Sequence, residues 1–368
     1  FSVVRNCDYN WTSDANQRWI LLAAKERGAD IFEAFANSPP YWMTNSNCSF
    51  GGQNNTNNLN YDKFADYLTE VVKWYKEEQG LTFRTLEPFN EPTTGFWHEF
   101  GMNAQFCLYT EVDRIVGPQE GCTYSYLAMT EVIAKVGAYL NNKDLLNTTS
   151  VSIADEGLFE GEIISIATIS TLKQILFDMA KNDGRRLWMS EWGSWSSKDM
   201  SASIILSEQI LNDMRNLKMK KTTNIVKEIF YYLIRFYNVP IFYLKKPIAW
   251  SYWQVIEHAP NGTYGNDYGA DFSNSTTSLD IRLSFYGFAQ YTKFIRPGYQ
   301  IISSDDGDTL AAQNASKKTL DLVCTNKNNA SDVWNINVSK FNISSFNTYH
   351  TYNDNETLKL HGLLLMVF

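Results

Sequence analysis

Strand-like and helix-like segments follow one another in turn along most of the chain, and this order limits the folds open to it. An apolar run at 31–37 precedes a helix-like segment at 61–80, and another apolar run follows at 83–90. Alternation of this kind over roughly 250 residues is typical of parallel strands joined by helical crossovers. We therefore expect an α/β fold, a (β/α)₈ TIM barrel over 1–296, with its site at the carboxyl ends of the strands. The helix-like segment repeats apolar residues at helical spacing, at Phe64, Leu68, Val71, Val72 and Tyr75.

An open, doubly wound sheet is the competing fold, but no glycine-rich phosphate loop follows any expected strand. In the helix expected at 12–28, Ser13 or Asp14 is the expected cap and Gly28 the stop. Further helices are expected at 124–140, 172–182, 203–218 and 281–294. Strands are expected to end at 3–5 and to run over 150–154, 163–169, 186–191 and 247–255.

The pattern changes after the Arg-Pro-Gly at 296–298. Residues 299–357 carry short alternating runs such as TLDLVCT and DVWNINVSKF, separated by Asn, Ser and Asp. Short runs in which apolar and polar residues alternate, separated by turn-forming residues, predict antiparallel strands. We therefore expect a β-sandwich domain over 297–368.

Composition excludes several classes of function. The chain has 368 residues, 44% hydrophobic and 15% aromatic, which excludes a disordered chain and allows a sizeable core. Its net charge of −8 argues against a nucleic-acid or anionic-membrane partner, because phosphate binding needs clustered Lys and Arg. The apolar stretch 225–246 is not expected to span a membrane, since Lys227, Glu228, Arg235 and Pro240 interrupt it.

Asn-X-Ser/Thr sequons are dense along the chain, which favours a secreted, extracellular glycoprotein. Chance matches in an asparagine-rich chain are the alternative. The chain opens on Phe1, so a secreted precursor would have lost its start. Five cysteines allow one or two disulfides, and none has metal-ligand spacing. We expect no metal, no cofactor and a monomer. The sequons lie at Asn10, Asn47, Asn54, Asn147, Asn261, Asn274, Asn314, Asn329, Asn337, Asn342 and Asn355.

Two expected strands end in a glutamate. LEPFNEPTTGFW at 86–97 carries Glu91, and RRLWMSEWGSW at 185–195 carries Glu191. Two carboxylates on one barrel rim suit glycoside hydrolysis, one as proton donor and the other as nucleophile, about 5–5.5 Å apart in retaining enzymes. Asn90 can hydrogen-bond the 2-hydroxyl of the sugar, and Pro92 ends the strand pairing. A lone glutamate at a strand end is more often a solvated loop residue, so the prediction depends on the pair.

Tryptophans cluster near the two glutamates and offer flat faces for sugar C–H groups, although any one of them is more often a core residue. Arg5, after an expected strand, either supports the charge of the nucleophile or is solvated. The clustered tryptophans are Trp97, Trp192, Trp195, Trp250 and Trp253.

At these residues the sequence resembles glycoside hydrolase family 30 of clan A, and most closely its endo-β-1,6-galactanase-like branch. The resemblance implies a (β/α)₈ barrel with a β-sandwich at its side and a retaining mechanism. Glu91 matches the acid/base of the family and Glu191 its nucleophile. The matching stretches are FEAFANSPPYWMT at 32–44, LEPFNEPTTGFWH at 86–98, GPQEGC at 117–122, RRLWMSEWGS at 185–194, AWSYWQ at 249–254 and FIRPGYQII at 294–302.

The resemblance also implies binding residues. Asn90 matches the asparagine before the acid/base, Trp42 falls in the block that lines the sugar site, and Trp253 matches a subsite aromatic. Trp97 is expected beside them, and Arg5 resembles an arginine after the second barrel strand. The polysaccharide substrate expected from this resemblance is a β-1,6-galactan.

The chain departs from the family pattern in several places. Against the family pattern we expect the first barrel strand to be missing and the sandwich to be short, and residues 102–116 and 225–246 have no counterpart that we identify. We therefore expect an incomplete barrel. The alternatives left open are another activity of the family (β-1,6-glucanase, glucuronoxylanase or glucosylceramidase) and a carbohydrate-binding protein without turnover.

Overall fold

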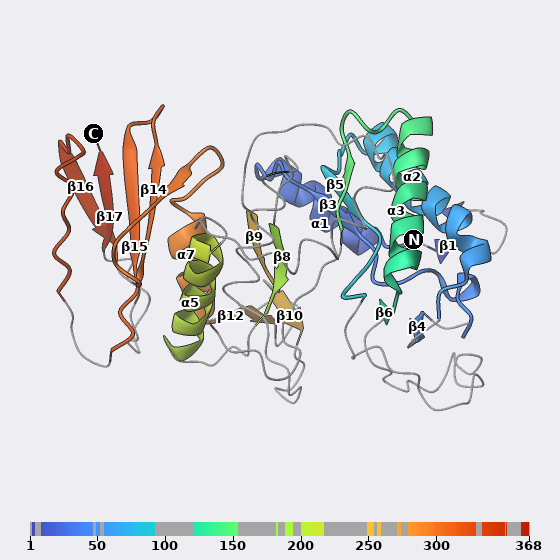
Figure 1. Cartoon of the computed structure of the whole chain (residues 1–368), viewed down its shortest axis with the longest axis horizontal. Coiled ribbons are helices and arrows are strands. Elements are labelled where there is room, and N and C mark those ends of the chain that lie inside the picture. The colour runs from blue at the N-terminus through green and yellow to red at the C-terminus, as the bar shows by residue number, and fades with distance from the viewer. Residues whose placement is uncertain are drawn as a thin grey trace. The chain divides into compact units, whose positions relative to one another are not determined.

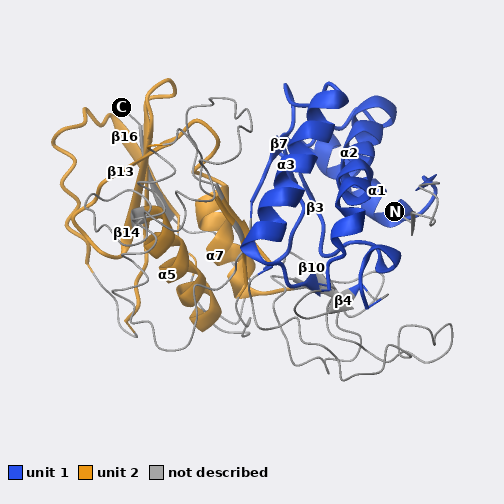
Figure 2. Ribbon diagram, turned by 45° about the vertical axis from the view of Figure 1, so that its right-hand side comes forward, with its two compact units in different colours: residues 1–159, 225–242 blue, residues 160–224, 243–368 orange. Residues whose placement is uncertain are grey.

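The computed structural model of the chain describes residues 2–3, 9–46, 49–51, 55–92, 121–153, 182, 188–193, 200–216, 249–253, 256–258, 271–273, 279–328, 333–349, 351 and 362–367 (Figure 1). The chain divides into two compact units (Figure 2). Unit 1 comprises residues 1–159 and 225–242, and unit 2 comprises 160–224 and 243–368. Each unit has a hydrophobic core of its own.

Unit 1 contains a parallel three-stranded sheet in the order β3-β5-β7, whose strands are Glu33–Phe35, Thr85–Glu87 and Ser150–Val151. Helix α2 (Tyr61–Glu78) connects β3 to β5, and α3 (Tyr126–Asn142) connects β5 to β7. In the register, Phe35 pairs with Glu87 and Leu86 with Val151. The βα alternation predicted for this part of the chain is confirmed, and the three strands end at one edge of the sheet.

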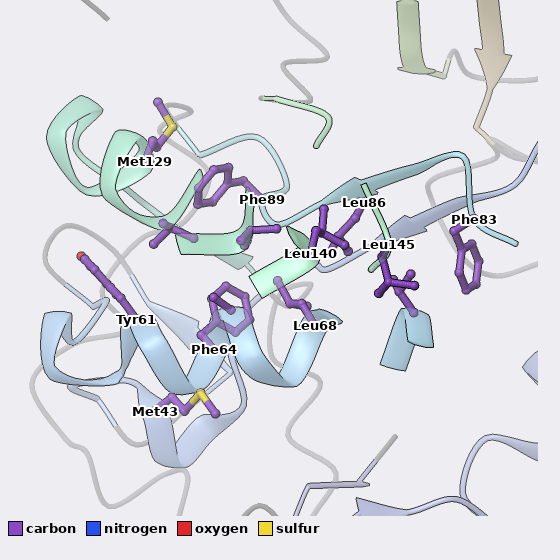
Figure 3. Packing of buried hydrophobic residues seen from close by; sticks show 14 of the residues in the cluster. Met43, Tyr61, Phe64, Leu68, Phe83, Leu86, Phe89, Met129, Leu140 and Leu145 are labelled. Carbon is purple, nitrogen blue, oxygen red and sulfur yellow. The ribbon is translucent and has the colours of Figure 1, made fainter. Parts of the chain in front are cut away.

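The core of unit 1 lies between this sheet and helices α2 and α3 (Figure 3). The apolar stripe predicted for α2 is confirmed at Phe64, Leu68, Val72 and Tyr75, which are buried, while Val71 is only partly buried. Burial of such side chains contributes about 1.5–3 kcal/mol each. Leu86 and Phe89 pack against the stripe from β5 and the turn after it, and so fix this strand end against the helices.

The expected strand at 83–90 is shorter in the structure. Its ladder stops at Glu87, because Pro88 has no N–H to donate. The helix predicted at 12–28 is α1 (Ala15–Glu26), with Asp14 at its N-cap and the chain reversing at Gly28, whose φ is +93°. The remaining elements of unit 1 are the 3₁₀ helices η1 (Tyr41–Met43) and η2 (Asn58–Asn60) and the parallel pair β4 (Phe50–Gly51) and β6 (Gly121–Cys122).

The start of the chain differs from the expectation of a parallel barrel strand. β1 (Ser2–Val3) pairs antiparallel with β2 (Tyr9–Asn10). The connection of five residues between them explains this, because parallel pairing needs a crossover of about a dozen or more residues.

Unit 2 contains a parallel pair, β8 (Trp188–Trp192) and β9 (Ala249–Tyr252). Helices α5 (Met200–Asn216) and α7 (Leu283–Thr292) pack together, and Leu206 and Ile210 of α5 belong to one core with Tyr291 of α7. The sheet β10-β11-β12 completes this part, with strands Ile256–His258, Asp271–Ser273 and Leu279–Ile281.

The antiparallel pairing predicted after residue 298 is confirmed in a five-stranded sheet of order β13-β14-β15-β17-β16. Leu310 and Val323 of this sheet pack in the core that contains α5 and α7. β17, the last strand along the chain, lies between β15 and β16. The strands are Gln300–Ile302, Thr309–Asn314, Thr319–Cys324, Ser345–Tyr349 and Gly362–Val367, from β13 to β17.

The described elements form an α/β protein with an added antiparallel sheet. The closed (β/α)₈ barrel, the β-sandwich and the boundary at residues 296 and 297 remain predictions. The strand expected at 163–169 lies outside the described residues, as does the helix expected at 172–182 apart from its last residue.

Candidate active site

The turn that carries Glu91 is anchored on both sides. Before it, Phe89 is fully buried and its ring meets the ring of Tyr124 edge-on, with centroids 4.6 Å apart. After it, the carbonyl oxygen of Pro92 accepts a hydrogen bond of 2.9 Å from the backbone N–H of Tyr124. The segment that leads into α3 therefore fixes the turn that follows β5.

Glu91 has a left-handed backbone conformation, with φ of +40°. This region costs a residue with a β-carbon about 1–2 kcal/mol, and the following Pro92 restricts the backbone of Glu91 further. The anchors at Phe89 and Pro92 hold the conformation. The side chain of Glu91 is half-buried at the carboxyl end of β5. Strained residues of this kind are concentrated at functional sites.

Asn90 is 2% exposed, and neither its Oδ1 nor its Nδ2 has a hydrogen-bond partner in the part of the chain that the structure describes. Leaving a buried polar group unpaired costs about 1–3 kcal/mol. An amide that stays unpaired inside a well-packed turn is suited to receive a ligand, because it offers both a donor and an acceptor.

Trp42 lies in the 3₁₀ helix η1, in the loop that follows β3. It is half-buried and packs against the core of unit 1, where its neighbour Met43 is buried. Part of the indole therefore stays accessible on the loops at the carboxyl ends of β3 and β5.

In unit 2 the strand pair β8–β9 has an irregular register. Met189 pairs with Trp250 and Trp192 with Tyr252, so two residues of β8 lie opposite the single residue Ser251 of β9. This is a β-bulge, and Glu191 is one of its two extra-ladder residues. Bulges re-aim side chains and are common beside active sites.

The two tryptophans next to this bulge belong to the core. The rings of Trp192 and Trp250 lie 5.6 Å apart, and both pack in the cluster that contains α5 and α7. The indole N–H of Trp250 also donates to Oδ2 of Asp213 on α5 at 2.9 Å. For these two residues the core interpretation is the correct one.

Glu191 and Trp253 lie near the carboxyl end of the strand pair, Glu191 in the bulge and Trp253 directly after β9. Trp192 and Tyr252 face the helices, and Glu191 and Trp253 are their immediate neighbours. Trp253 is 38% exposed, and its backbone N–H donates to the carbonyl oxygen of Trp192 at 2.8 Å. The predicted nucleophile and the predicted subsite aromatic thus lie near the same end of one strand pair.

Arg5 and Trp97 lie outside the described residues, as do Trp195 and the stretches 102–116 and 225–246. Glu91, Asn90 and Trp42 belong to unit 1, while Glu191 and Trp253 belong to unit 2. Sequence reasoning missed Tyr124, because a tyrosine before a helix gives no signal that its backbone meets Pro92.

Among the described residues no group of three His, Cys, Asp or Glu side chains is placed to hold a metal ion. Within the same residues, no helix combines the length and the apolar character needed to cross a bilayer. Cys122 is buried and Cys324 is partly buried, and the other three cysteines lie outside the described ranges. The hydroxyl of Tyr124 stays protonated, because burial raises its pKa well above the ordinary value.

Solved structures of other proteins share the fold of this chain. The chain aligns with a conserved exported protein from Bacteroides fragilis at a TM-score of 0.69 and 17% identity, covering 99% of this chain and 80% of the other. A glycoside hydrolase family 30 subfamily 8 xylanase from Clostridium acetobutylicum aligns at 0.61 and 15% identity, covering 97% and 81%. At these identities the likeness shows the fold, an α/β fold shared with a family 30 glycosidase.

Sequence comparisons show which glycosidases the chain is similar to. The model of O-glycosyl hydrolase family 30 matches residues 2–159. An endo-β-1,6-galactanase of Hypocrea rufa is 27% identical over 348 residues, covering 88% of this chain and 61% of the relative. An exo-β-1,6-galactobiohydrolase of Bifidobacterium longum subsp. longum is 24% identical, covering 93% and 26%. The chain thus spans less than two thirds of the length of either curated relative. The chain is therefore similar to glycoside hydrolases of family 30, and among the curated proteins to an endo-β-1,6-galactanase.

Proposed function

We propose that the protein is a retaining glycoside hydrolase that cleaves β-1,6-linked galactan within the chain. The observation that carries the proposal is the position of the two glutamates. Glu91 follows the carboxyl end of the parallel strand β5 on a strained turn, and Glu191 lies in the bulge near the carboxyl end of the parallel strand β8. Catalytic residues of barrel enzymes lie at such strand ends.

In this mechanism Glu191 attacks the anomeric carbon while Glu91 protonates the departing glycosidic oxygen. A covalent glycosyl ester on Glu191 results. Glu91, now a carboxylate, then takes a proton from water, the water attacks the anomeric carbon, and the sugar leaves with its original anomeric configuration.

Asn90 holds the 2-hydroxyl of the sugar, and this hydrogen bond strengthens in the transition state. Trp42 and Trp253 supply flat apolar surfaces for the sugar rings, since both keep part of the indole accessible. In the same proposal, Trp97 is a further stacking surface for the sugar. Arg5 is a cation that stabilises the charge of the nucleophile.

The choice of galactan rests on the relatives, one named an endo-β-1,6-galactanase and the other an exo-β-1,6-galactobiohydrolase. The second name makes an exo-acting enzyme the second candidate. Products separate the two, because an endo enzyme releases a ladder of oligosaccharides and a galactobiohydrolase releases only the disaccharide.

We also propose that the protein is a secreted, glycosylated monomer. The density of Asn-X-Ser/Thr sequons supports this, and one protein of similar fold is described as exported. Peptide mass spectrometry of the native protein, with and without glycosidase treatment, tests occupancy at the sequons. Unmodified asparagine at every sequon in the secreted protein would contradict the glycoprotein part.

The deciding experiment measures reducing sugar released from de-arabinosylated β-1,6-galactan by the wild type, by Glu191→Gln and by Glu78→Gln. Glu78 is an exposed residue at the end of α2 and serves as the matched control. The proposal expects release by the wild type and the control, and loss of at least about a thousandfold in Glu191→Gln. A folded wild type that binds galactan without releasing sugar would instead be a carbohydrate-binding protein.

A further inference from the structure

A second unpaired amide lies at the same sheet edge as Asn90. Oδ1 of Asn37 is shielded from solvent and has no hydrogen-bond partner within the described ranges. With the Oδ1 and Nδ2 atoms of Asn90, three amide atoms at the ends of β3 and β5 lack partners. Buried polar groups in folded proteins are nearly always paired, so each exception needs a reason.

The register places the two asparagines at one edge. Phe35 pairs with Glu87, and the N–H of Ala36 donates to the carbonyl oxygen of Glu87 at 3.0 Å. Asn37 is the next residue after Ala36, and Asn90 comes three residues after Glu87. Adjacent strands lie about 4.8 Å apart. Both asparagines therefore lie just beyond the carboxyl ends of two neighbouring strands.

The residues that lead to Asn37 alternate between the two faces of the sheet. Ala34 and Ala36 pack against the core beneath α2 and α3. Glu33 and Phe35 alternate with them, and the hydroxyl of Thr85 on β5 donates to Oε2 of Glu33. Asn37 follows Phe35 by two residues, in the bend directly after β3.

A role in stability does not account for Asn37, because an unpaired buried acceptor costs free energy instead of supplying it. A neutral carbonyl oxygen is suited to accept a hydrogen bond from an uncharged hydroxyl group. The chemistry therefore fits a sugar and does not select for an anion.

We infer that Asn37 is a substrate-contacting residue whose side-chain carbonyl accepts a hydrogen bond from a hydroxyl of the bound sugar, beside the amide of Asn90. This inference rests on the proposed function and adds a residue to that site. Asn37 then contributes to the choice of sugar, since a site built to hold a hydroxyl discriminates strongly against sugars that lack it or present it differently.

The test uses Asn37→Ala and Asn37→Leu, the second of which keeps the side-chain volume. Asn58→Ala is the matched control, an exposed asparagine in the same loop between β3 and α2. Three quantities are measured: the melting temperature without sugar, kcat/KM on β-1,6-galactan, and the Kd of β-1,6-galactobiose by calorimetry.

The expected result combines two changes of opposite sense. Both Asn37 variants keep or raise the melting temperature, because an unpaired acceptor has been removed. Both lower kcat/KM and weaken galactobiose binding by about 10- to 100-fold. The control changes neither quantity.

A fall in the melting temperature of both variants, with the Kd of galactobiose unchanged, would overturn the inference and make Asn37 a structural residue. A wild type that binds galactobiose but does not hydrolyse galactan would contradict only the proposed hydrolase activity. The comparison of Kd values would still show whether Asn37 contacts the sugar. If the wild type neither binds nor cleaves, both the proposed function and the inference fail.

Discussion

The backbone N–H of Tyr124 donates a 2.9 Å hydrogen bond to the carbonyl oxygen of Pro92, and its ring packs edge-on against Phe89. One residue thus holds the turn of Asn90 and Glu91 from both ends, across 32 positions of sequence. Pre-organisation of this kind matters in catalysis, because a carboxyl group displaced by about 1 Å can lose about a hundredfold in rate.

Tyr124→Phe is expected to leave stability and activity nearly unchanged. The hydroxyl of Tyr124 has no partner among the described residues, whereas the ring keeps its contact with Phe89 and the backbone N–H is untouched. Tyr124→Ala removes the ring and is expected to cost about 3–5 kcal/mol of unfolding free energy. Denaturant unfolding of the two variants beside the wild type measures this difference. Equal losses in both would show that the hydroxyl, and not the ring, stabilises the turn.

Substitution of Trp250, in β9, is expected to lower stability. Substitution of Trp253, directly after β9, is expected to raise KM. Trp250→Phe loses the hydrogen bond to the buried carboxylate of Asp213 and is expected to cost about 1–3 kcal/mol of stability with little change in KM. Trp253→Ala removes a 38% exposed side chain and is expected to raise KM for galactan several-fold at nearly constant melting temperature. Melting curves and Michaelis kinetics on both variants check the contrast. A larger KM effect in Trp250→Phe would reverse the assignment of Trp250 to the core and of Trp253 to the sugar site.

Elements with long apolar repeats could be predicted from sequence. The helix at 61–80 was found within a few residues, because the spacing of its apolar side chains matches the face that is buried. The strand that contains Glu191 was also found within a few residues. The early end of β5 at Pro88 is also a local effect of the missing N–H of proline, but the strand expected at 83–90 ran past this residue.

Other features depend on contacts that no local pattern records. The bulge at Glu191 arises only when β8 meets β9, and the unpaired amide of Asn37 is evident only once its surroundings are known. The stretch FANSPPYW did contain a signal for Asn37, since a polar side chain directly follows an apolar strand. The strand end expected at 3–5 failed as a parallel strand because a short connection forces antiparallel pairing.

Helices α5 and α7 approach each other closely at Gly287. A β-carbon added there would lie 2.9 Å from Cβ and Oγ of Ser203. Gly287→Ala is therefore expected to push the helices apart and cost about 1–3 kcal/mol. Adding Ser203→Gly removes the opposing side chain and is expected to recover part of the loss. A double-mutant cycle by denaturant unfolding gives the coupling, and strictly additive effects would contradict this close contact.

Asp321 gives the protein a specific dependence of stability on pH. Its carboxyl group is 0% exposed in the central region of the antiparallel sheet, where it lies between Ala312 and Leu365 of the neighbouring strands. Burial raises its pKa to about 6, while the Tyr299 hydroxyl and Lys317 act in the opposite direction. In the unfolded chain the pKa of an aspartate is about 3.9.

Between about pH 4 and pH 6 the folded state keeps the proton on Asp321 and the unfolded state has released it. The unfolding free energy therefore falls as pH rises through this window, by up to about 3 kcal/mol, and is constant above it as far as this group is concerned. Asp321→Asn cannot ionise, so its stability relative to the wild type is expected to rise from pH 4 to pH 7.5. Any cost of the amide that does not depend on pH cancels in this comparison. Thermal unfolding at both pH values, with the exposed Asp305→Asn as control, measures the change, and an equal shift at the two pH values would mean that Asp321 ionises normally in the folded protein.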